Sequence, residues 1–273
     1  MLIRLSSDNH FEHRVKRSDP ATKLFKTIDR HIPPDDRDSE STLVLAGDIS
    51  PYFGQRVLIL EHLLPRFRRI IYIAGNHEFY GGELTDWGFE ANRIAERLPE
   101  NIYLSRTYQA QNKEFDGVNF IYSTMWTEFG EGRPLEEMTI ANMPDCRAIS
   151  YLGKRLKPEY IWPIHKANLE STKSFLETCY AQNPAIPRVV ITHHMPAMSL
   201  CDPRYGNSPA NGLFASRDTE PLLAADYAPQ FWLYGHTHAP NKRKLENTVC
   251  ICNPKGYPKE LGCNYEPRMF IEV

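Results

Sequence analysis

The stretch YGHTHAP at residues 234–240 contains two histidines separated by one residue, and imidazole side chains can bind metal ions or transfer protons. His236 and His238 follow the apolar run FWLY and a glycine. An apolar run that ends in this way predicts either a polar turn or a pair of metal ligands. The motif by itself leaves both interpretations open, so further ligands have to be sought elsewhere in the chain.

Four other apolar runs of the chain also end in an acid, an amide or an imidazole. These residues are Asp8, Asn9 and His10 after LIRLS, Asp48 after LVLAG, Asn76, His77 and Glu78 after IIYIAG, and His193 and His194 after RVVIT. Six of the ten histidines therefore lie at the ends of apolar runs, which argues against a chance accumulation. Since open α/β sheets place their sites at the carboxyl ends of strands, the five segments predict one common site.

The types of these side chains predict two divalent metal ions. Carboxylate, imidazole and amide ligands suit Mn, Fe or Zn, and no cysteine belongs to the set, which disfavours a closed thiolate site. A carboxylate can bridge two ions, and two divalent cations with Asp8, Asp48 and a bridging hydroxide retain a charge of about +1, which favours phosphate oxygens. Two such ions lower the pKa of a shared water molecule and hold both oxygens of an in-line displacement. We therefore expect hydrolysis of a phosphate ester, with His236 and His238 as ligands.

The elements that must position these residues alternate between strands and helices in the first part of the chain. Strands are predicted at 1–6, 42–48, 69–76, 101–105, 107–111, 118–126, 188–194, 230–236, 242–246, 248–253 and 269–273, and helices at 21–31, 56–64, 83–98, 158–182 and 218–227. This order predicts α/β packing that finishes with antiparallel strands. We expect one domain over residues 1–273, with an irregular insertion at about 125–157.

Composition limits the classes of partner. The 273 residues carry a formal net charge of -2, which gives no electrostatic reason to expect a nucleic acid or membrane partner. The N-terminus lacks the apolar core of a signal peptide, and no apolar run is long enough to cross a bilayer. The six cysteines form no CxxC pair, which is typical of reduced thiols. A cytoplasmic protein of unknown oligomeric state is the expectation.

The five segments together resemble the calcineurin-like metallophosphoesterase superfamily. SDNH, AGDIS, AGNHEF, ITHHMP and YGHTHAP follow the order of the family pattern and span residues 8–238. Further stretches, among them STMWTEFG and CNPKGYP, resemble a bacterial and phage group within that superfamily. The resemblance implies an α/β fold of two packed mixed β-sheets flanked by helices, with a dimetal site on loops at one end.

The resemblance also implies a role for each residue of the five segments. The first metal would be held by Asp8, His10, Asp48 and His238, and the second by Asp48, Asn76, His193 and His236. Mn²⁺ is the preferred ion, with Fe, Zn or Ni as alternatives. His193 aligns better than His194 with the single histidine of the family, but the doublet leaves this assignment open.

His77 is the implied catalytic residue. It would lie beside the metals as a cation that stabilises the transition state or protonates the leaving oxygen, with Glu78 as its orienting neighbour. We therefore predict a dimetal hydrolase in which a hydroxide bridging the metals attacks phosphorus. Its substrate would be a small, nucleotide-like phosphate ester, and the sequence does not distinguish a phosphodiesterase from a phosphatase.

Two other functions remain alternatives. A nuclease acting on DNA or RNA would share these motifs, but the near-neutral charge and the lack of a basic, aromatic-rich run argue against it. A catalytically silent metal-binding scaffold would retain the fold, but such a protein should have lost ligands or the catalytic histidine.

Overall fold

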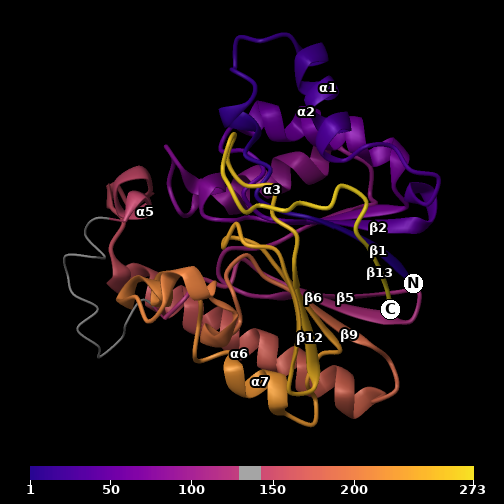
Figure 1. Ribbon diagram of the computed structural model, residues 1–273, viewed down its shortest axis with the longest axis vertical. Coiled ribbons are helices and arrows are strands. Elements are labelled where there is room, and N and C mark those ends of the chain that lie inside the picture. Colours follow the sequence, from indigo (N-terminus) through magenta and orange to yellow (C-terminus); the bar gives the residue numbers. More distant parts are fainter. Residues whose placement is uncertain (129–142) are drawn as a thin grey trace.

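Residues 1–128 and 143–273 are described by a computed structural model, and they form four layers (Figure 1). A five-stranded sheet has the order β13-β1-β2-β3-β4, and a six-stranded sheet has the order β11-β12-β10-β9-β6-β5. Helices α1, α2 and α3 cover the outer face of the first sheet, and α6 and α7 cover the outer face of the second. The predicted fold of two packed mixed sheets flanked by helices is confirmed.

The strand bounds are as follows. The first sheet contains β1 (Leu2–Ser6), β2 (Ser41–Ala46), β3 (Arg69–Ile73), β4 (Ile102–Leu104) and β13 (Phe270–Glu272). The second contains β5 (Gln111–Phe115), β6 (Val118–Tyr122), β9 (Arg188–Ile191), β10 (Phe231–Tyr234), β11 (Asn241–Leu245) and β12 (Thr248–Cys252). The helices are α1 (Ala21–His31), α2 (Phe53–Leu63), α3 (Asp86–Arg97), α5 (Pro144–Ala148), α6 (Pro158–Gln182) and α7 (Glu220–Ala224).

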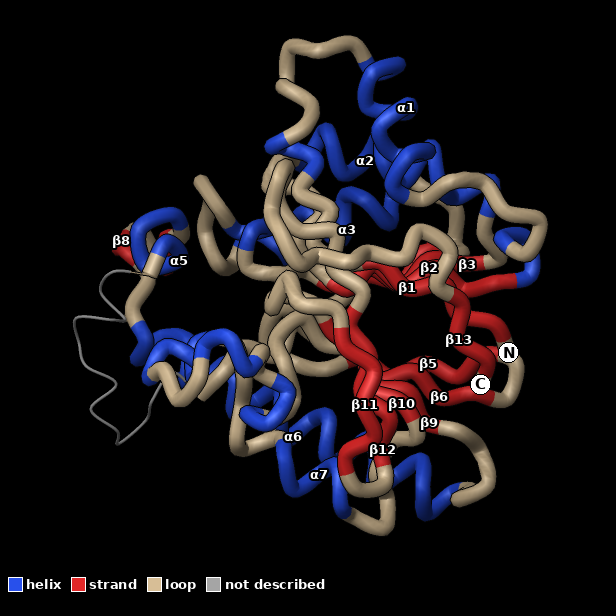
Figure 2. Tube along the Cα trace, viewed as in Figure 1, coloured by secondary structure: helices blue, strands red, loops and turns tan. Residues whose placement is uncertain are grey.

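Strand direction brings the ends of the site-bearing strands together. Strands β1 to β4 are parallel to one another, and so are β6, β9, β10 and β12, whereas β13, β5 and β11 run antiparallel at the edges. An isolated bridge between Ser7 and Pro254, which follow β1 and β12, connects the two sheets beyond their carboxyl ends. The loops that follow these strands gather on the side of the sheets away from the chain termini (Figure 2).

The continuous apolar runs of the strands reflect burial on both faces of each sheet. Successive side chains of a strand point to opposite faces. Leu43 and Leu45 of β2 accordingly pack in the cluster with the helices, whereas Val44 and Ala46 pack in the cluster between the sheets. Such strands keep no polar face, because both faces are covered.

Two predictions of local structure need correction. The strand predicted at 107–111 is wrong, because β5 begins only at Gln111 and a turn at Asp116 and Gly117 joins it to β6. The edge strand β5 has the polar sequence QNKEF, so apolar patterning does not reveal it. Within the predicted insertion, the described residues 143–157 form α5 and the hairpin of β7 (Ser150–Tyr151) and β8 (Lys154–Arg155), while 129–142 lie outside the described residues.

Within the described ranges, no helix is long and apolar enough to cross a membrane.

Candidate dimetal active site

The loops after β1, β2, β3, β9 and β10 bring all seven predicted ligands into one place. Two groups have ligand atoms within 4.8 Å of one another, namely Asp8 with His10 and His238, and Asp48 with His193 and His236. His10 Nε2 lies 3.7 Å from Asp48 Oδ2, which connects the two groups. The remaining predicted ligand, Asn76, places Oδ1 at 3.1 Å from His193 Nε2. The grouping agrees with the two ligand sets that the resemblance implies.

The backbone at most of these residues adopts an uncommon conformation. Five of the seven predicted ligands have positive φ angles between 43° and 68°, namely Asp8, His10, Asp48, His236 and His238. Left-handed backbone is costly for residues other than glycine and persists where the surrounding structure imposes it, commonly at active sites. The left-handed residues therefore turn the chain sharply after each strand and direct these side chains toward one site.

Two motif glycines are required by the close approach of ligand side chains. A Cβ atom on Gly75 would lie 2.2 Å from Asp48 Oδ1, and a Cβ atom on Gly235 would lie 2.8 Å from Asp8 Oδ2. Both distances are shorter than side chains tolerate, so the carboxylates pass directly over the glycine backbone. The glycines of AGN and YGH are thus explained by space at the site.

The tautomers of the histidines fit cation binding. His193 Nδ1 donates to the Ala46 carbonyl at 2.9 Å, which leaves the Nε2 lone pair facing Asn76 Oδ1 at 3.1 Å and Asp48 Oδ1 at 3.3 Å. Orientation of a ligand histidine through its second nitrogen is common in metal sites. His236 Nε2 is buried and has no hydrogen-bond partner among the described residues. Nε2 of His193 thus faces other predicted ligands, and Nε2 of His236 is available to a cation.

The second pair of imidazoles shows the same arrangement. Nδ1 of His10 lies 3.1 Å from Glu12 Oε1, and Nδ1 of His238 lies 2.7 Å from Glu260 Oε2. A carboxylate beside Nδ1 keeps the proton on that nitrogen, and the two Nε2 atoms then face one another at 3.1 Å. A cation between them satisfies both lone pairs, so the donor set fits divalent metal ions.

The raised pKa values of two predicted ligands, His193 and His238, show that carboxylates surround their imidazoles. Burial would lower the pKa of His193, but the carboxylates of Asp48 and Asp8 outweigh it and raise the pKa to about 10. Burial would likewise lower the pKa of His238, but Asp8 and Glu260 raise it to about 9. Metal ions compete with protons for the same nitrogen atoms, so cations of higher charge are suited to this site.

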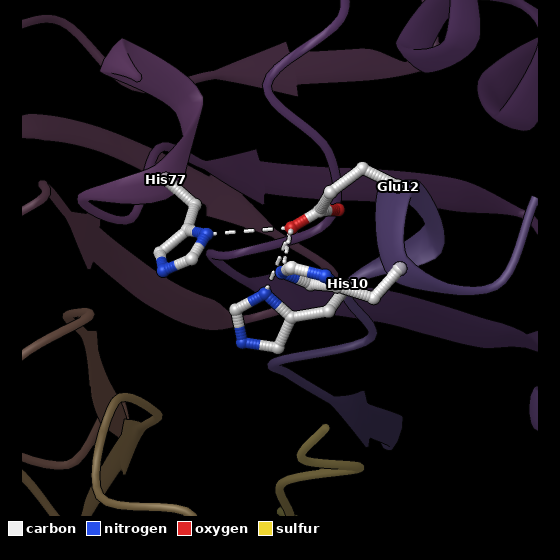
Figure 3. Close-up of side chains that lie close together, drawn as sticks. His10, Glu12 and His77 are labelled. Atoms are coloured by element: carbon white, nitrogen blue, oxygen red, sulfur yellow. Dashed lines mark hydrogen bonds and ion pairs between the residues drawn. The ribbon is translucent and has the colours of Figure 1, made fainter. Parts of the chain in front are cut away.

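Glu12, and not the predicted Glu78, contacts the catalytic candidate His77. Glu12 Oε1 lies 3.3 Å from His77 Nδ1 and 3.1 Å from His10 Nδ1 (Figure 3). Burial would raise the pKa of Glu12, but hydrogen bonds with His10 and His77 outweigh it and lower the pKa to about 2. One carboxylate thus orients a predicted ligand and the predicted catalytic residue. Its place two residues after His10 was the only signal for it in the sequence.

Glu78 performs a different task. Its carboxylate accepts hydrogen bonds from the backbone N–H groups of Asp48, Ile49 and Ser50 at 2.9, 2.7 and 3.2 Å, and from Gly75 at 2.6 Å. The Tyr72 hydroxyl donates to it at 2.8 Å. The expectation that Glu78 orients His77 is therefore wrong, since the carboxylate is occupied in fastening the loop after β2 to the loop after β3.

Two tyrosines complete the surroundings of His77. The Tyr257 hydroxyl lies 3.0 Å from His77 Nε2, and the Tyr80 ring stacks on the imidazole with centroids 4.1 Å apart. The His77 backbone N–H donates to Asp48 Oδ1 at 2.8 Å. Both ring nitrogens of His77 are therefore oriented, Nδ1 by Glu12 and Nε2 by Tyr257. Sequence reasoning missed Tyr257, which lies 180 residues from His77.

Asn76 is oriented by a residue of the predicted insertion. Its Nδ2 atom donates to Asp145 Oδ1 at 2.7 Å, so its Oδ1 atom faces His193. Asp145 belongs to α5 and also accepts a hydrogen bond from the Tyr80 hydroxyl at 2.6 Å. Asp145 lies in MPDCRAIS, another of the stretches that resemble the bacterial and phage group, but sequence reasoning gave it no role.

His193 and His194 of the histidine doublet have different surroundings in the structure. His193 faces Asp48 and Asn76, whereas the His194 ring packs between Trp126, at a centroid distance of 5.1 Å, and His236, at 4.3 Å. Burial lowers the pKa of His194 well below its usual range. The geometry favours His193 as the ligand and leaves His194 as a neutral packing residue.

A cavity of about 430 Å³ opens above the ligands. His77, His236 and Tyr257 are among the residues that line it, together with Phe214, Asp145 and Glu260. No lysine or arginine of the described segments lines it. The cavity is large enough for a small molecule that places one anionic group on the ligand cluster.

Comparison with known proteins identifies the family. The model of the calcineurin-like phosphoesterase family matches residues 1–240. The uncharacterized protein L509 of Acanthamoeba polyphaga mimivirus is 26% identical over 290 residues, which cover 100% of this chain and 96% of that protein.

A solved structure shows the same fold. Phosphopantetheinyl hydrolase from Mycobacterium tuberculosis superposes with a TM-score of 0.66 at 17% identity, over 96% of this chain and 93% of that one. Tyr257 and Glu260 lie beyond the residues that the family model matches, although both contact the site. With its match over residues 1–240, the chain belongs to the calcineurin-like phosphoesterase family, a family of metal-dependent phosphoric ester hydrolases.

Proposed function

We propose that the protein is a two-metal phosphodiesterase that acts on a small substrate with a single phosphate. The observation that carries the proposal is the convergence of two ligand groups and His77 on one cavity. Asp8, His10, Asp48 and His238 would hold one ion, and Asp48, Asn76, His193 and His236 the other. Two divalent ions supply positive charge for the phosphate oxygens and lower the pKa of a water molecule.

His77 would act on the leaving group. Glu12 holds Nδ1, so the proton that can move is the one on Nε2, which faces Tyr257 and the cavity. The carboxylates of Asp48 and Glu12 raise the pKa of His77 against the effect of burial, which favours the protonated form. A protonated His77 can donate from Nε2 to the oxygen that departs from phosphorus.

The charges around the cavity favour a phosphodiester over a monoester. A monoester carries close to two negative charges at neutral pH, whereas a diester carries one. The described lining offers no lysine or arginine for a second charge and adds the carboxylates of Asp145 and Glu260. The same lack of cationic lining argues against a nuclease, which needs contacts to several phosphates. The M. tuberculosis neighbour, a phosphopantetheinyl hydrolase, supports a phosphate that bears an organic group.

The test compares two chromogenic esters on metal-stripped protein reconstituted with Mn²⁺. We expect two ions per chain, turnover of bis-p-nitrophenyl phosphate, and a lower rate with p-nitrophenyl phosphate. His77→Ala should keep both ions and lose about 10²–10⁴-fold in turnover of a diester with a poor leaving group. Two bound ions without turnover of either ester would instead indicate the silent scaffold, and a preference for the monoester would contradict the diester proposal.

A further inference from the structure

A second cavity of about 220 Å³ adjoins the catalytic one. Tyr205, Phe214 and Thr237 line both cavities, so the two share a wall. Phe214 also stacks on the predicted ligand His236, with ring centroids 4.7 Å apart and an interplanar angle of 30°. A molecule with its phosphate on the ligand cluster can therefore extend past Phe214 into the second cavity.

The loop that builds this side cavity is held in place by its own hydrogen bonds. The Met195 backbone N–H donates to the Phe214 carbonyl at 3.0 Å, the Ser216 N–H donates to the Met195 carbonyl at 3.0 Å, and Met195 and Ala215 form an isolated parallel bridge. Asn211 Nδ2 donates to the Gly206 carbonyl at 2.9 Å, which closes the loop across its middle. The side cavity is therefore a formed feature of the loop after β9.

The lining of the side cavity is mainly carbon and sulfur. Met195, Cys201, Ala210 and Phe214 are among the residues that line it. The one carboxylate in the lining, Asp202, is bound by the Arg204 guanidinium at 2.9 and 2.8 Å, which neutralises it. An ionised group would lose its hydration here without gaining a partner.

At least two polar atoms of the lining are available to a ligand. The Thr237 hydroxyl and Asn211 Oδ1 make no hydrogen bond to any residue in the described part of the chain. Thr237 lies at the junction of the two cavities, and Asn211 lies inside the side cavity. An apolar pocket with a few such polar groups is typical of sites that recognise an uncharged organic group.

We propose that the side cavity binds one of the two organic groups of the substrate phosphodiester, and that this group is uncharged and largely apolar. The inference rests on the proposed function, because it takes the phosphate to lie on the ligand cluster. It narrows the substrate class to phosphate esters of an uncharged, apolar alcohol and excludes nucleoside di- and triphosphates. Phe214 would set the distance between phosphate and organic group, since it contacts His236 on one side and the side cavity on the other.

Binding of alkylphosphonates to the Mn²⁺-loaded protein tests the inference, because each probe carries one phosphonate and one organic group. Calorimetry would compare methylphosphonate, butylphosphonate and 3-carboxypropylphosphonate. One buried methylene group strengthens binding about fourfold, so we expect the Kd of butylphosphonate to be at least about tenfold lower than that of methylphosphonate. 3-Carboxypropylphosphonate should bind no more tightly than methylphosphonate.

Variants locate the gain in the side cavity. Ala210→Phe fills it and should remove the advantage of butylphosphonate while leaving the Kd of methylphosphonate within about twofold. Cys201→Phe fills the same space and serves if Ala210→Phe does not fold. Asn207→Phe is the matched control, because Asn207 is exposed in the same loop and lines neither cavity.

The outcomes separate the two proposals. No binding of any phosphonate would overturn the proposed function itself. Binding of methyl- and butylphosphonate with equal Kd would overturn only the side-cavity inference. A butyl advantage that survives in both Ala210→Phe and Cys201→Phe would place the organic group elsewhere and would also overturn it.

Discussion

The loops after β1, β2 and β3 of the five-stranded sheet carry both predicted carboxylate ligands, whereas the loops after β9 and β10 of the six-stranded sheet carry only imidazoles. The first set is fastened internally, since Glu78 joins the loops of Asp48 and Gly75. The second set is positioned by the first: His193 Nδ1 donates to Ala46 at 2.9 Å, and the His236 N–H donates to Asp8 at 3.0 Å.

This difference assigns separate tasks to the two sheets. The five-stranded sheet carries the carboxylates, among them the proposed shared ligand Asp48, and the proposed catalytic residue His77, while the six-stranded sheet adds the imidazoles that complete each ligand group. A change at Asp48 of the first set should therefore affect both metals, and a change at a histidine of the second set should affect one.

Asp48→Asn is the most severe test of this division. Asp48 contacts His193 at 3.3 Å and His10 at 3.7 Å, so it is the side chain that belongs to both ligand groups. An amide cannot supply the same charge to two ions, and we expect turnover to fall on the order of 10³-fold or more, since metal ions contribute several kcal/mol to such reactions. Metal analysis of the purified variant should show loss of both ions. Full occupancy with a nearly normal rate would refute the shared ligand.

His193→Ala should affect only one ion and lower turnover roughly 10²-fold, because a single lone pair on one side is removed. Metal content should fall from two ions to about one per chain. His194→Ala is the matched control, since His194 packs between Trp126 and His236 without facing Asp48. If His194→Ala loses an ion and His193→Ala keeps both, the assignment within the doublet is reversed.

Glu78→Ala should reduce stability, because four backbone N–H groups would lose their acceptor in a buried place. Unsatisfied buried donors cost about 1–3 kcal/mol each, so a loss of at least about 3 kcal/mol in the free energy of unfolding is expected. Chemical denaturation followed by fluorescence measures it. A variant as stable as the original protein would show that the two loops do not depend on Glu78.

Glu12→Gln should lower turnover about 10–100-fold, as is usual for partners that orient site histidines. The loss should be larger for diesters with poor leaving groups, because Glu12 contacts the imidazole of His77, which is proposed to donate the proton. The dependence of rate on the leaving-group pKa is the measurement. An equal loss for all leaving groups would restrict Glu12 to its contact with His10.

Tyr257→Phe should have the smallest effect. The variant lacks the hydroxyl that contacts His77 Nε2. Loss of one such hydrogen bond costs about 1 kcal/mol, which corresponds to a decrease of about fivefold in turnover, mainly for esters with poor leaving groups. Metal content should not change. Tyr52→Phe is the control, because Tyr52 is exposed and lies outside both cavities. A rate equal to that of the unaltered protein would show that Tyr257 only closes the cavity wall.

Much of the fold follows from local patterning. The strands that carry the site are buried on both faces, so each has a continuous apolar sequence. The turn that follows each strand contains the polar residues of a motif. Helix α1 occupies the predicted range Ala21–His31. The edge strand β5 was missed because one side of an edge strand faces water and needs no apolar pattern.

The sequence by itself determined the residue types at the five strand ends, their order and the family to which they belong. Only the tertiary structure decided which carboxylate contacts which imidazole: Glu12 instead of Glu78 orients His77, and Asp145, Tyr257 and Glu260 arrive from distant segments. The physical reason is that a hydrogen bond depends on the direction in which each side chain leaves the backbone. At these left-handed turns that direction is set by neighbours far apart in the chain.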